Sequence, residues 1–504
     1  MQPRLSSSIA AFATAFLLCA AGCDDEPVGD AGADAALPDA GGTRDAGRAD
    51  AGEMLDAGPG DAGPQDAGLD DGGVDACTGP EVCNGADDDC DGDADEGFDL
   101  DNDTANCGLC GMACDAGDVC RFGLCAEDVP QPVSIAAGAA HTCVRMSDGD
   151  VRCWGDNALG QLGQGDLEPH TGIVTVMTLS NIQAVDAGAN HSCVVTRSDV
   201  AVCWGDDAMG QIGNRAPVGA PRPATIPAGV SGGIVGVETI ALGHATSCAG
   251  TPFGSLFCWG ANGSGQIGDG TTDQQDSAVP VMRDDGLFDG IDTGEAHSCA
   301  LLRVTGEPAA VRCWGDNSDG AYGSGAFTAS NTPAVTSFPG ATQVQTGAGV
   351  TCVLTGEGDV HCAGRNRRGA LGDGVASHAD FDTVDRSATP VTVAGLSDAV
   401  EVELSHEHAC ARLADGTLQC WGSNAHGQLG DGATHDACQD MPSADCAFSP
   451  VAVPGLSDAI DVATGAEHTC ALLRDGRVFC WGRNAEGQLG VEGADRSTPV
   501  EVSL

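Results

Sequence analysis

From residue 131 to the last residue, short runs of apolar and β-branched residues alternate with turns rich in glycine, asparagine and aspartate. The first such region has Ser-Ile-Ala-Ala-Gly at 134–138 and His-Thr-Cys-Val at 141–144. A Ser-Asp-Gly turn at 147–149 then leads into Val-Arg-Cys-Trp-Gly at 151–155. Two β-prone runs joined by an Asp-Gly turn are typical of a β-hairpin. The pattern therefore predicts an all-β region built from hairpins.

The same pattern occurs seven times, as Gly-x-x-His-[Ser/Thr]-Cys followed by Cys-Trp-Gly-x-Asn-x-x-Gly-Gln-Leu-Gly. The copies start 50 to 60 residues apart, a spacing typical of units that bury their cores by stacking on neighbours. Seven such units predict a seven-bladed β-propeller over residues 131–504. The last seven residues, 498–504, repeat a Pro-Val-x-Val pattern with no hairpin behind them. We predict that this C-terminal strand completes the first blade and closes the ring.

The two cysteines of each unit flank the hairpin turn, ten residues apart in six units and fourteen apart in the fourth. An even spacing places both on one face of an antiparallel ladder, where opposed residues lie close enough for a disulfide. We predict one disulfide in each hairpin and one more in a late insertion, the alternative being reduced, buried cysteines. The predicted pairs are Cys143–Cys153, Cys193–Cys203, Cys248–Cys258, Cys299–Cys313, Cys352–Cys362, Cys410–Cys420, Cys438–Cys446 and Cys470–Cys480.

The units resemble the repeat of the regulator of chromosome condensation superfamily. The resemblance is carried by Cys-Trp-Gly-Asp-Asn-Ala-Leu-Gly-Gln-Leu-Gly at 153–163 and Cys-Trp-Gly-Arg-Asn-Ala-Glu-Gly-Gln-Leu-Gly at 480–490, and it covers 131–504. It implies a seven-bladed propeller. The fifth unit departs from the pattern with Ala363 in place of tryptophan, and the recurring histidine is Thr246 in the third unit and Val350 in the fifth.

The recurring histidines and tryptophans are predicted to be structural. Sevenfold geometry keeps equivalent residues far apart around the ring, so we expect each histidine to bond to backbone within its own blade and each tryptophan to fill the core. The sequence has no Ser-His-Asp elbow, phosphate-binding Gly-rich loop or His-Glu-x-x-His helix, so we predict no catalytic residues and no enzyme activity. The histidines are His141, His191, His297, His408 and His468.

The N-terminal segment has the pattern of an export signal. Arg4 precedes an apolar stretch, 9–22, that is too short to span a membrane as a helix. Ala-Ala-Gly before Cys23 resembles a bacterial lipobox, which implies lipidation of Cys23, although the usual leucine is Ala20 here. We predict a signal peptide at 1–22 and a lipid anchor as the contact with the membrane, the alternative being ordinary signal-peptidase cleavage.

Residues 23–76 are predicted to hold the anchor site and a disordered linker, in which Asp-Ala-Gly occurs seven times. Residues 77–127 form a Cys-rich module that resembles an Asp/Cys-rich metal-binding motif of secreted myxobacterial proteins. Its acidic residues alternate before and after Gly92, as in a calcium loop, but the bidentate glutamate of a full EF-hand is missing. We predict calcium binding here. The alternatives are an acidic turn held by disulfides, and copper or zinc on the cysteines. The predicted ligands are Asp87, Asp89, Asp91, Asp93, Asp95 and Glu96.

The net charge of −53 excludes nucleic-acid binding through the phosphate backbone, which needs a basic surface. Twenty-six cysteines behind an export signal indicate an oxidising compartment. We therefore expect a lipid-anchored protein of the cell envelope, at the outer membrane, the cell surface or the periplasm.

Length variation among the units is greatest in 373–389 and 431–449, between Gly-Gln-Leu-Gly and the next Pro-Val strand. Insertions in one connection of a repeat array emerge on one face, often the binding face. A shorter insertion at 305–308 is expected to emerge there too. The alternative is tolerated loop drift. The predicted contact residues are Phe381, Arg386, His435, Asp436, Met441 and Phe448.

These features predict an exported, lipid-anchored propeller that binds a protein or a glycan at the cell envelope. One alternative is an exchange factor for a small GTPase, as in the eukaryotic branch of the family, which would require a cytosolic chain. Another is an enzyme in the central channel, which carboxylates or histidines clustered around the axis would favour. A third is a calcium-binding envelope protein that acts through the module at 77–127.

Overall fold

The computed structural model describes residues 103–107, 112–114, 118–121, 124–127, 129–170, 172–214, 220–225, 234, 236–282, 286–304, 309–376, 385–438 and 443–504. The predicted signal peptide, Cys23, the linker and the acidic loop at 87–96 lie outside these residues. Within them, no helix is long and apolar enough to cross a membrane. A small two-stranded sheet of β1 (Asp118–Arg121) and β2 (Leu124–Glu127) belongs to the Cys-rich module.

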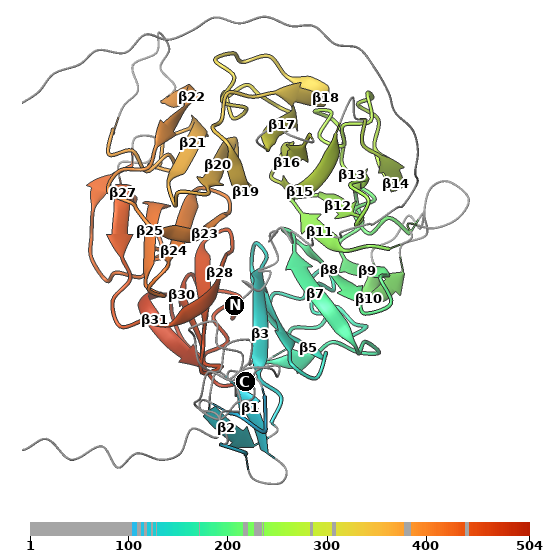
Figure 1. The fold of residues 1–504 in the computed structure, drawn as a ribbon, viewed down its shortest axis with the longest axis vertical. Coiled ribbons are helices and arrows are strands. Elements are labelled where there is room, and N and C mark those ends of the chain that lie inside the picture. The colour runs from blue at the N-terminus through green and yellow to red at the C-terminus, as the bar shows by residue number, and fades with distance from the viewer. Residues whose placement is uncertain are drawn as a thin grey trace, which may run out of the picture. The chain divides into compact units, whose positions relative to one another are not determined.

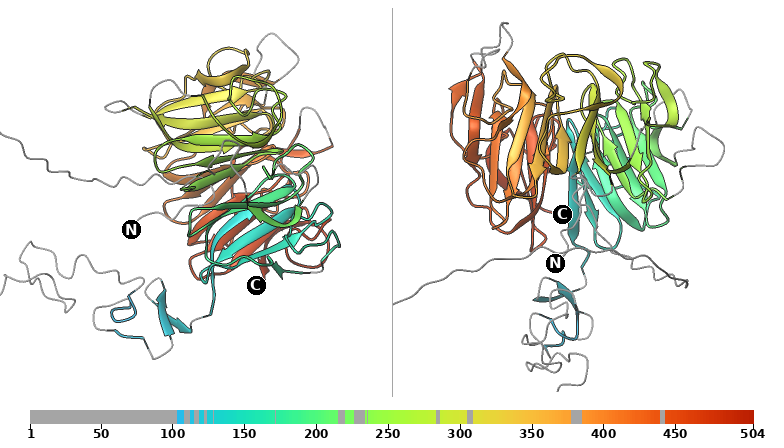
Figure 2. Two further views of the ribbon diagram at one scale, coloured as in Figure 1. Left: turned by 90° about the vertical axis from the view of Figure 1, so that its right-hand side faces the viewer. Right: turned by 45° about the horizontal axis from the view of Figure 1, so that its top comes forward.

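Seven antiparallel sheets follow one another around a ring (Figure 1). The left view in Figure 2 shows the sheets packed face to face. The seven-bladed propeller predicted from the repeat is confirmed. Blade 1 is β3 (Pro132–Ala137), β4 (His141–Met146), β5 (Val151–Gly155) and β6 (Val174–Thr175). Blade 2 is β7 (Ile182–Ala187), β8 (His191–Thr196), β9 (Ala201–Gly205) and β10 (Ala220–Thr225).

Blade 3 is β11 (Thr239–Leu242), β12 (Thr246–Gly250), β13 (Leu256–Gly260) and β14 (Gln275–Pro280). Blade 4 is β15 (Leu287–Thr293), β16 (His297–Arg303), β17 (Ala310–Gly315) and β18 (Ser330–Val335). Blade 5 is β19 (Ala341–Thr346), β20 (Val350–Thr355), β21 (Val360–Arg365) and β22 (Arg386–Thr392). Blade 6 is β23 (Ala399–Leu404), β24 (His408–Leu413), β25 (Leu418–Ser423) and β27 (Asp445–Ala452), with the short β26 (Asp436–Ala437) at its edge. Blade 7 is β28 (Ala459–Thr464), β29 (His468–Leu473), β30 (Val478–Gly482) and β31 (Arg496–Val502).

The C-terminal strand does not complete the first blade, and this part of the prediction is wrong. β31 pairs with β30, with Val500 opposite Cys480, and is the outer strand of blade 7. Each Pro-Val strand is the outer strand of the hairpin before it, and blade 1 has its own outer strand in β6. The ring therefore closes by packing of blade 7 on blade 1, without exchange of a strand.

Every hairpin carries the disulfide that the even spacing predicts. Cys143 lies directly opposite Cys153 in the ladder, and their Cα atoms are 4.1 Å apart. The other six hairpins repeat this arrangement. Cys438 and Cys446 form the eighth predicted disulfide inside the insertion of blade 6.

Neighbouring blades are joined by hydrogen bonds between repeated side chains. The backbone carbonyl of Gln161 in blade 1 accepts from Nε1 of Trp204 at 2.7 Å and from the hydroxyl of Ser192 at 3.1 Å, both in blade 2. Nε2 of His141 lies 2.8 Å from the same hydroxyl. Because the serine proton goes to the carbonyl, the histidine must donate through Nε2–H. Each such set of hydrogen bonds joins the loop and the histidine of one blade to the hairpin hydroxyl and the core tryptophan of the next blade.

The prediction that each histidine bonds to backbone in its own blade is therefore wrong, although its structural role is right. In all five blades that have it, the histidine bonds to a hydroxyl of the next blade. The reason is that the start of the second strand faces the neighbouring sheet. The pairs are His141–Ser192, His191–Ser247, His297–Thr351, His408–Thr469 and, across the seam of the ring, His468–Thr142.

Between blades 5 and 6, both partners of the repeated histidine contact are replaced. Blade 5 has Val350 in place of histidine, and blade 6 has Ala409 in place of the hydroxyl; both are buried in one apolar cluster. Blade 5 also lacks the tryptophan. In the preceding blade 4, the buried Tyr322 belongs to an apolar cluster against which Phe338 packs.

In six blades a glycine stands where one blade meets the carbonyl groups of the next; blade 6 has Ser405 at this position. A Cβ built on Gly243 would lie 2.3 Å from the carbonyl oxygen of Gly294 and 2.6 Å from that of Thr293. Equivalent glycines in five other blades make the same close approach. The glycine that opens each Gly-x-x-His motif is therefore a packing requirement between blades.

The seam of the ring has the same contacts as the other blade interfaces. The indole of Trp154 donates to the carbonyl of Gln488 at 2.9 Å. The backbone N–H of Ile135 donates to Oδ2 of Asp461 at 3.0 Å. Ile135 and Trp154 of blade 1 also share an apolar cluster with residues of blade 7, including Val502 of the C-terminal strand. These contacts close the propeller.

Replacing Gly243 by alanine should destabilise the propeller by about 1–3 kcal/mol, because the added methyl group must push two blades apart. Gly263→Ala is the matched control, since a Cβ there meets nothing within 4 Å, and its effect should stay within about 0.5 kcal/mol. Urea unfolding monitored by tryptophan fluorescence measures both. Equal stability of the two variants would contradict the close-packing account.

The buried histidines should make the fold sensitive to acid. Burial lowers the pKa of His408 to about 3, against 6.5 in the unfolded chain. Because the pKa is lower in the folded state than in the unfolded chain, acid favours the unfolded chain. The free energy of unfolding therefore has its full value above pH 6.5 and declines as the pH falls below that. At pH 5 the loss is about 2 kcal/mol for one such histidine. His141, His191, His297 and His468 behave alike.

A His408→Gln variant can still donate to Thr469 but does not titrate. We expect it to lose about 2 kcal/mol less stability than the wild type between pH 7 and pH 5, measured by urea unfolding at both values. Buried carboxyl groups change the free energy of unfolding in the opposite direction as the pH falls. Because the wild type and the His408→Gln variant share these groups, their effect cancels in the comparison. The same pH dependence in wild type and His408→Gln would refute the conclusion that buried His408 causes part of the loss of stability in acid.

Candidate functional site

One face of the ring carries two loops from every blade. In blade 1 these are residues 138–140, between β3 and β4, and residues 156–160, after β5. His141 pairs with Gly155 at this end of the hairpin, so both loops emerge here, and Asp156 N donates to the carbonyl of Ala140 at 2.9 Å. The other six blades make the same backbone bond. We call this surface the mouth face, because the central channel opens on it.

The loop after each Trp-Gly strand is held by its own asparagine. In blade 1, Oδ1 of Asn157 accepts from Leu162 N at 3.1 Å, and its Nδ2 donates to the carbonyl of Glu168 at 2.9 Å. Asparagine repeats this in the other blades except blade 2, where Asp207 accepts from Ile212 N. The residue before the following glycine is different in every blade. From blade 1 to blade 7 these tip residues are Leu159, Met209, Ser264, Asp319, Arg368, His426 and Glu486.

The tips of blades 1 and 2 are apolar. Leu159 is 41% exposed and Met209 is 48% exposed. The residues before them, Ala158 and Ala208, are exposed as well. Leucine and methionine at equivalent positions of adjacent blades give this sector of a highly acidic protein an apolar surface, which is typical of a contact site.

The tips of blades 4 to 7 are ionisable residues, and those of blades 4, 5 and 6 pair with side chains of the next blade. Arg365 donates from Nε and Nη2 to Oδ2 of Asp319 at 2.9 and 2.7 Å, linking blade 5 to blade 4. Arg368 Nη1 lies 2.6 Å from Oε2 of Glu407, linking blade 5 to blade 6. These pairs hold the charged sector in a fixed arrangement. A second network joins blades 6 and 7 through His426, Glu467, Arg483 and Asp495.

The ends of the seven inner strands enclose a cavity of about 120 Å³ that is lined by Asp186, Asp292 and Glu403. Asp186 accepts from Leu242 N of the next blade at 2.8 Å, and Asp292 accepts from Thr346 N at 2.6 Å. Burial raises the pKa of Asp186 well above its ordinary value and that of Asp292 to about 6. Burial, together with the nearby carboxylates, also raises the pKa of Glu403.

Sequence reasoning missed these carboxylates, although a signal was present. Each lies directly opposite the first cysteine of its hairpin, seven residues before it in the chain. Aligning the units on that cysteine would have shown acidic residues at one position that is elsewhere alanine or glutamine. The equivalent residues of the other blades are Ala136, Ala241, Gln345 and Ala463.

The predicted contact residues occupy different environments. Phe381 and Met441 lie outside the described residues. Arg386 begins β22, where its guanidinium carbon lies 4.3 Å from the centre of the Phe327 ring and Nη1 donates to the carbonyl of Ser318. It therefore borders the mouth face at blade 4.

The other three predicted contacts belong to the insertion of blade 6. Nε2 of His435 lies 3.0 Å from Oδ2 of Asp431, and Asp436 is exposed in β26. Phe448 is 7% exposed and packs with Cys438 and Cys446, so it forms the insertion's core and offers no side-chain surface to a partner.

The insertion at 305–308 was expected on the same face as the long connections. It lies outside the described residues, but the strands that it joins settle which end of the blade it leaves. Leu302 of β16 pairs with Ala310 of β17, at the end of the hairpin opposite to the pair His297–Gly315. Because the mouth-face loops leave at the His297 end, the expectation is wrong.

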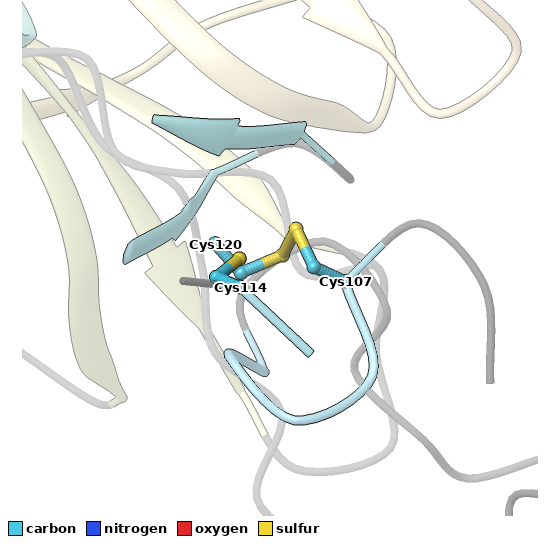
Figure 3. Close-up of side chains that lie close together, drawn as sticks. All are labelled: Cys107, Cys114 and Cys120. Atoms are coloured by element: carbon cyan, nitrogen blue, oxygen red, sulfur yellow. A yellow bond between two sulfur atoms is a disulfide. The ribbon is translucent and has the colours of Figure 1, made fainter. Parts of the chain in front are cut away.

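Three cysteines of the Cys-rich module lie close together (Figure 3). Cys107 and Cys120 form a disulfide, and Cys114 is disulfide-bonded as well. None of the three sulfur atoms is therefore a thiolate that could bind a soft metal ion. The calcium ligands predicted at 87–96 lie outside the described residues, and calcium binding there stays a prediction.

Comparison with known proteins agrees with this architecture. A family model described as RCC1-like domain matches residues 104–446, and models of the regulator of chromosome condensation (RCC1) repeat match 459–488 and 475–504. The chain is 31% identical over 399 residues to the ultraviolet-B receptor UVR8 of Arabidopsis thaliana, covering 75% of this chain and 83% of the receptor. It is 31% identical over 261 residues to a secretion-regulating guanine nucleotide exchange factor of Bos taurus, covering 49% of this chain and 52% of that protein.

Among solved structures, Prp20p of Saccharomyces cerevisiae has a similar fold, with a TM-score of 0.62 at 18% identity over 71% of this chain and 86% of that one. At that identity the likeness concerns the fold. The match of the family model over more than half of the chain, and the match to the plant receptor over most of both chains, agree with the seven repeats and the ring that they form. The chain therefore belongs to the RCC1-like family of repeat propellers.

Proposed function

We propose that this chain is an exported, lipid-anchored propeller that binds another protein through its mouth face. The observation that carries the proposal is the difference among the seven tip residues on an otherwise repeated frame. The asparagine, glycine, tryptophan and histidine of each unit are used for packing between and within blades. The tip side chains of Leu159 and Met209 are exposed instead, so the divergence of the tips fits recognition of a partner.

The arrangement of the tips favours a protein partner over a glycan. Glycan sites commonly use exposed aromatic rings, but all six tryptophans are buried here, and the exposed ring of Phe327 beside the mouth face is stacked with the Arg386 guanidinium. The apolar sector at Leu159 and Met209 would receive an apolar surface of the partner. The paired charges at Arg365 and Glu407 would set the partner's orientation, because fixed charges at an interface favour one register.

The alternative of an enzyme in the channel gains the carboxylates and two histidines, His244 and His406, that line the same cavity. The carboxylates, however, are already engaged by the chain's own donors. Both oxygens of Asp186 accept backbone N–H groups, from Ala187 and Leu242. Asp292 accepts from the backbone and the hydroxyl of Thr346. The repeat histidines, which could act as bases, are bonded to hydroxyls between blades. The channel carboxylates therefore serve blade packing first.

The alternative of an exchange factor rests on relatives that include a secretion-regulating guanine nucleotide exchange factor and a propeller whose binding to Gsp1p has been described. It would place the partner in the cytosol, and the signal pattern at 1–22 opposes that. A small GTPase captured by the mouth face would favour this alternative over an envelope partner.

Replacing Leu159 and Met209 together by aspartate should lower the affinity for the partner at least about tenfold, because the apolar sector would then carry two charges. Thermal stability should change little, since both side chains are on the surface. Capture from solubilised envelopes on immobilised protein, followed by titration of the captured protein, measures the effect.

Phe253→Asp is the matched control, because Phe253 is 80% exposed in the turn between β12 and β13, at the other end of the blade. Its capture should equal that of the wild type. Capture that falls in the Phe253 variant, or persists in the double variant, would refute the assignment of the binding face.

Replacing Cys23 by serine should move the protein from the detergent phase to the aqueous phase in detergent partitioning, because the acyl chains would have no attachment site. Cys19→Ser, within the predicted signal peptide, should partition like the wild type. A wild-type protein that stays in the aqueous phase would refute the anchor while leaving the binding face untouched.

A further inference from the structure

The connection between the second and third strands of each blade lies on the face opposite the mouth. One position of this connection, five residues after the first cysteine, is acidic in four blades and serine in blade 2. In blades 3 and 4, which lie side by side in the ring (Figure 1), it is apolar. Two adjacent blades therefore carry an apolar side chain where most others carry a charge. From blade 1 to blade 7 the residues are Asp148, Ser198, Phe253, Val304, Glu357, Asp415 and Asp475.

Phe253, Leu287 and Val304 form one patch on this face, which we call the basal patch. A Cβ built on Gly254, next to Phe253, would lie 2.5 Å from Cβ of Leu287, and one built on Gly286 would lie 3.1 Å from Cγ2 of Val304. The three side chains of the patch are 80%, 50% and 38% exposed. Leu287 also departs from the repeat, because the other blades have glycine, asparagine, glutamine or aspartate twelve residues before the first cysteine.

The chain that leads to the predicted lipid anchor joins the ring on the same face as the basal patch. β3 begins at Pro132, which pairs with Met146 at the end of the hairpin away from the mouth. Just before it, the backbone carbonyl of Gln131 accepts from Ser147 N at 2.8 Å, so the incoming chain lies beside the turn of blade 1. An anchor on Cys23 would therefore reach the ring from the side of the basal patch.

The size of the basal patch favours a lipid surface over a protein. Three apolar side chains are too few to bury the roughly 800 Å² on each partner that a standard protein interface needs. A contact with a bilayer can be smaller, because an anchor keeps the patch near the lipid and raises its effective concentration there. Phenylalanine and leucine are also typical of the apolar faces that enter the headgroup region from the membrane surface.

The distribution of charge fixes which part of this face can meet lipid. The acidic residues at the equivalent position belong to blades 1, 5, 6 and 7, and carboxylates lose favourable hydration in a lipid interface. Beside the basal patch, Arg303 is paired with Asp289. Blades 3 and 4 are therefore the part of the face that suits a bilayer. Because the net charge of the chain is −53, a zwitterionic bilayer suits it better than an anionic one.

We propose that the basal patch rests on the lipid surface that holds the predicted anchor, with Phe253 inserted among the headgroups. The mouth face then points away from the bilayer and toward its partner. This inference rests on the lipid anchor of the proposed function and adds an orientation to it. Capture of the partner from solubilised envelopes involves no bilayer, so the basal patch has no part in that measurement.

Quenching of an added tryptophan by brominated lipid tests the proposal. The lipidated full chain carrying Phe253→Trp is inserted into phosphatidylcholine vesicles with and without bromine on the acyl chains. All six native tryptophans are buried in the propeller, so the difference from the parent chain reports the added indole. We expect bromine to cause a loss of this added emission, because the indole lies in the bilayer interface.

Two matched variants place the added indole elsewhere on the ring. Glu357→Trp occupies the same turn position in blade 5, and Met209→Trp lies on the mouth face. Bromine should leave the added emission of both unchanged. Adding Leu287→Asp and Val304→Asp to the Phe253→Trp chain should abolish the quenching, because two charges would replace the apolar contact. Both of these side chains are exposed, so the fold should tolerate the change.

Quenching confined to Phe253→Trp, and lost with the two aspartates, supports the proposal. No quenching on vesicle-bound protein, or equal quenching of all three tryptophan variants, would overturn it. A protein partner or a dimer whose binding depends on Phe253 would overturn it as well. A chain that does not float with the vesicles shows instead that the anchor is wrong. A hexahistidine tag in place of residues 1–23, on nickel-chelating lipid, then supplies the attachment, and the same quenching comparison decides.

Discussion

Neighbouring blades approach so closely that a methyl group added to Gly243 would overlap a carbonyl oxygen of the next blade. That approach brings the indole of Trp204 and the hydroxyl of Ser192 onto one carbonyl of the preceding blade. The buried histidine then needs its donor on Nε2 to satisfy the same hydroxyl. The residues that look like a signature of function in the repeat are therefore those that set the distance between blades.

Because packing uses the repeated residues, the chemistry that remains lies where the units differ. The tips diverge on the mouth face, from Leu159 in blade 1 to Arg368 in blade 5. The inner strands diverge at the position opposite the first cysteine, which is alanine in three blades and acidic in three. The mouth face of this ring of near-identical units is therefore asymmetric. Blades 1 and 2 are apolar at the mouth, and blades 4 to 7 are charged.

The interior combines two kinds of buried titratable group with opposite responses to pH. Burial holds the pKa of His191 at about 3, so acid opposes folding there. Burial raises the pKa of Asp461, so protonation favours folding there. The histidines bond to hydroxyl groups in every interface that has them, whereas the carboxyl groups that line the cavity come from blades 2, 4 and 6.

The sequence by itself determined the number of blades, the hairpins and the disulfides, because a hairpin and its cysteine pair depend on contacts ten to fourteen residues apart. It did not determine to which hairpin a Pro-Val strand belongs. Each such strand lies between two hairpins in the sequence, and the repeat pattern allows it to pair with the one before it or the one after it. The partner of each histidine and the cluster around Glu403 were decided by the closed ring. Both depend on contacts between different blades, such as that between Ile135 and Asp461, which no local pattern records.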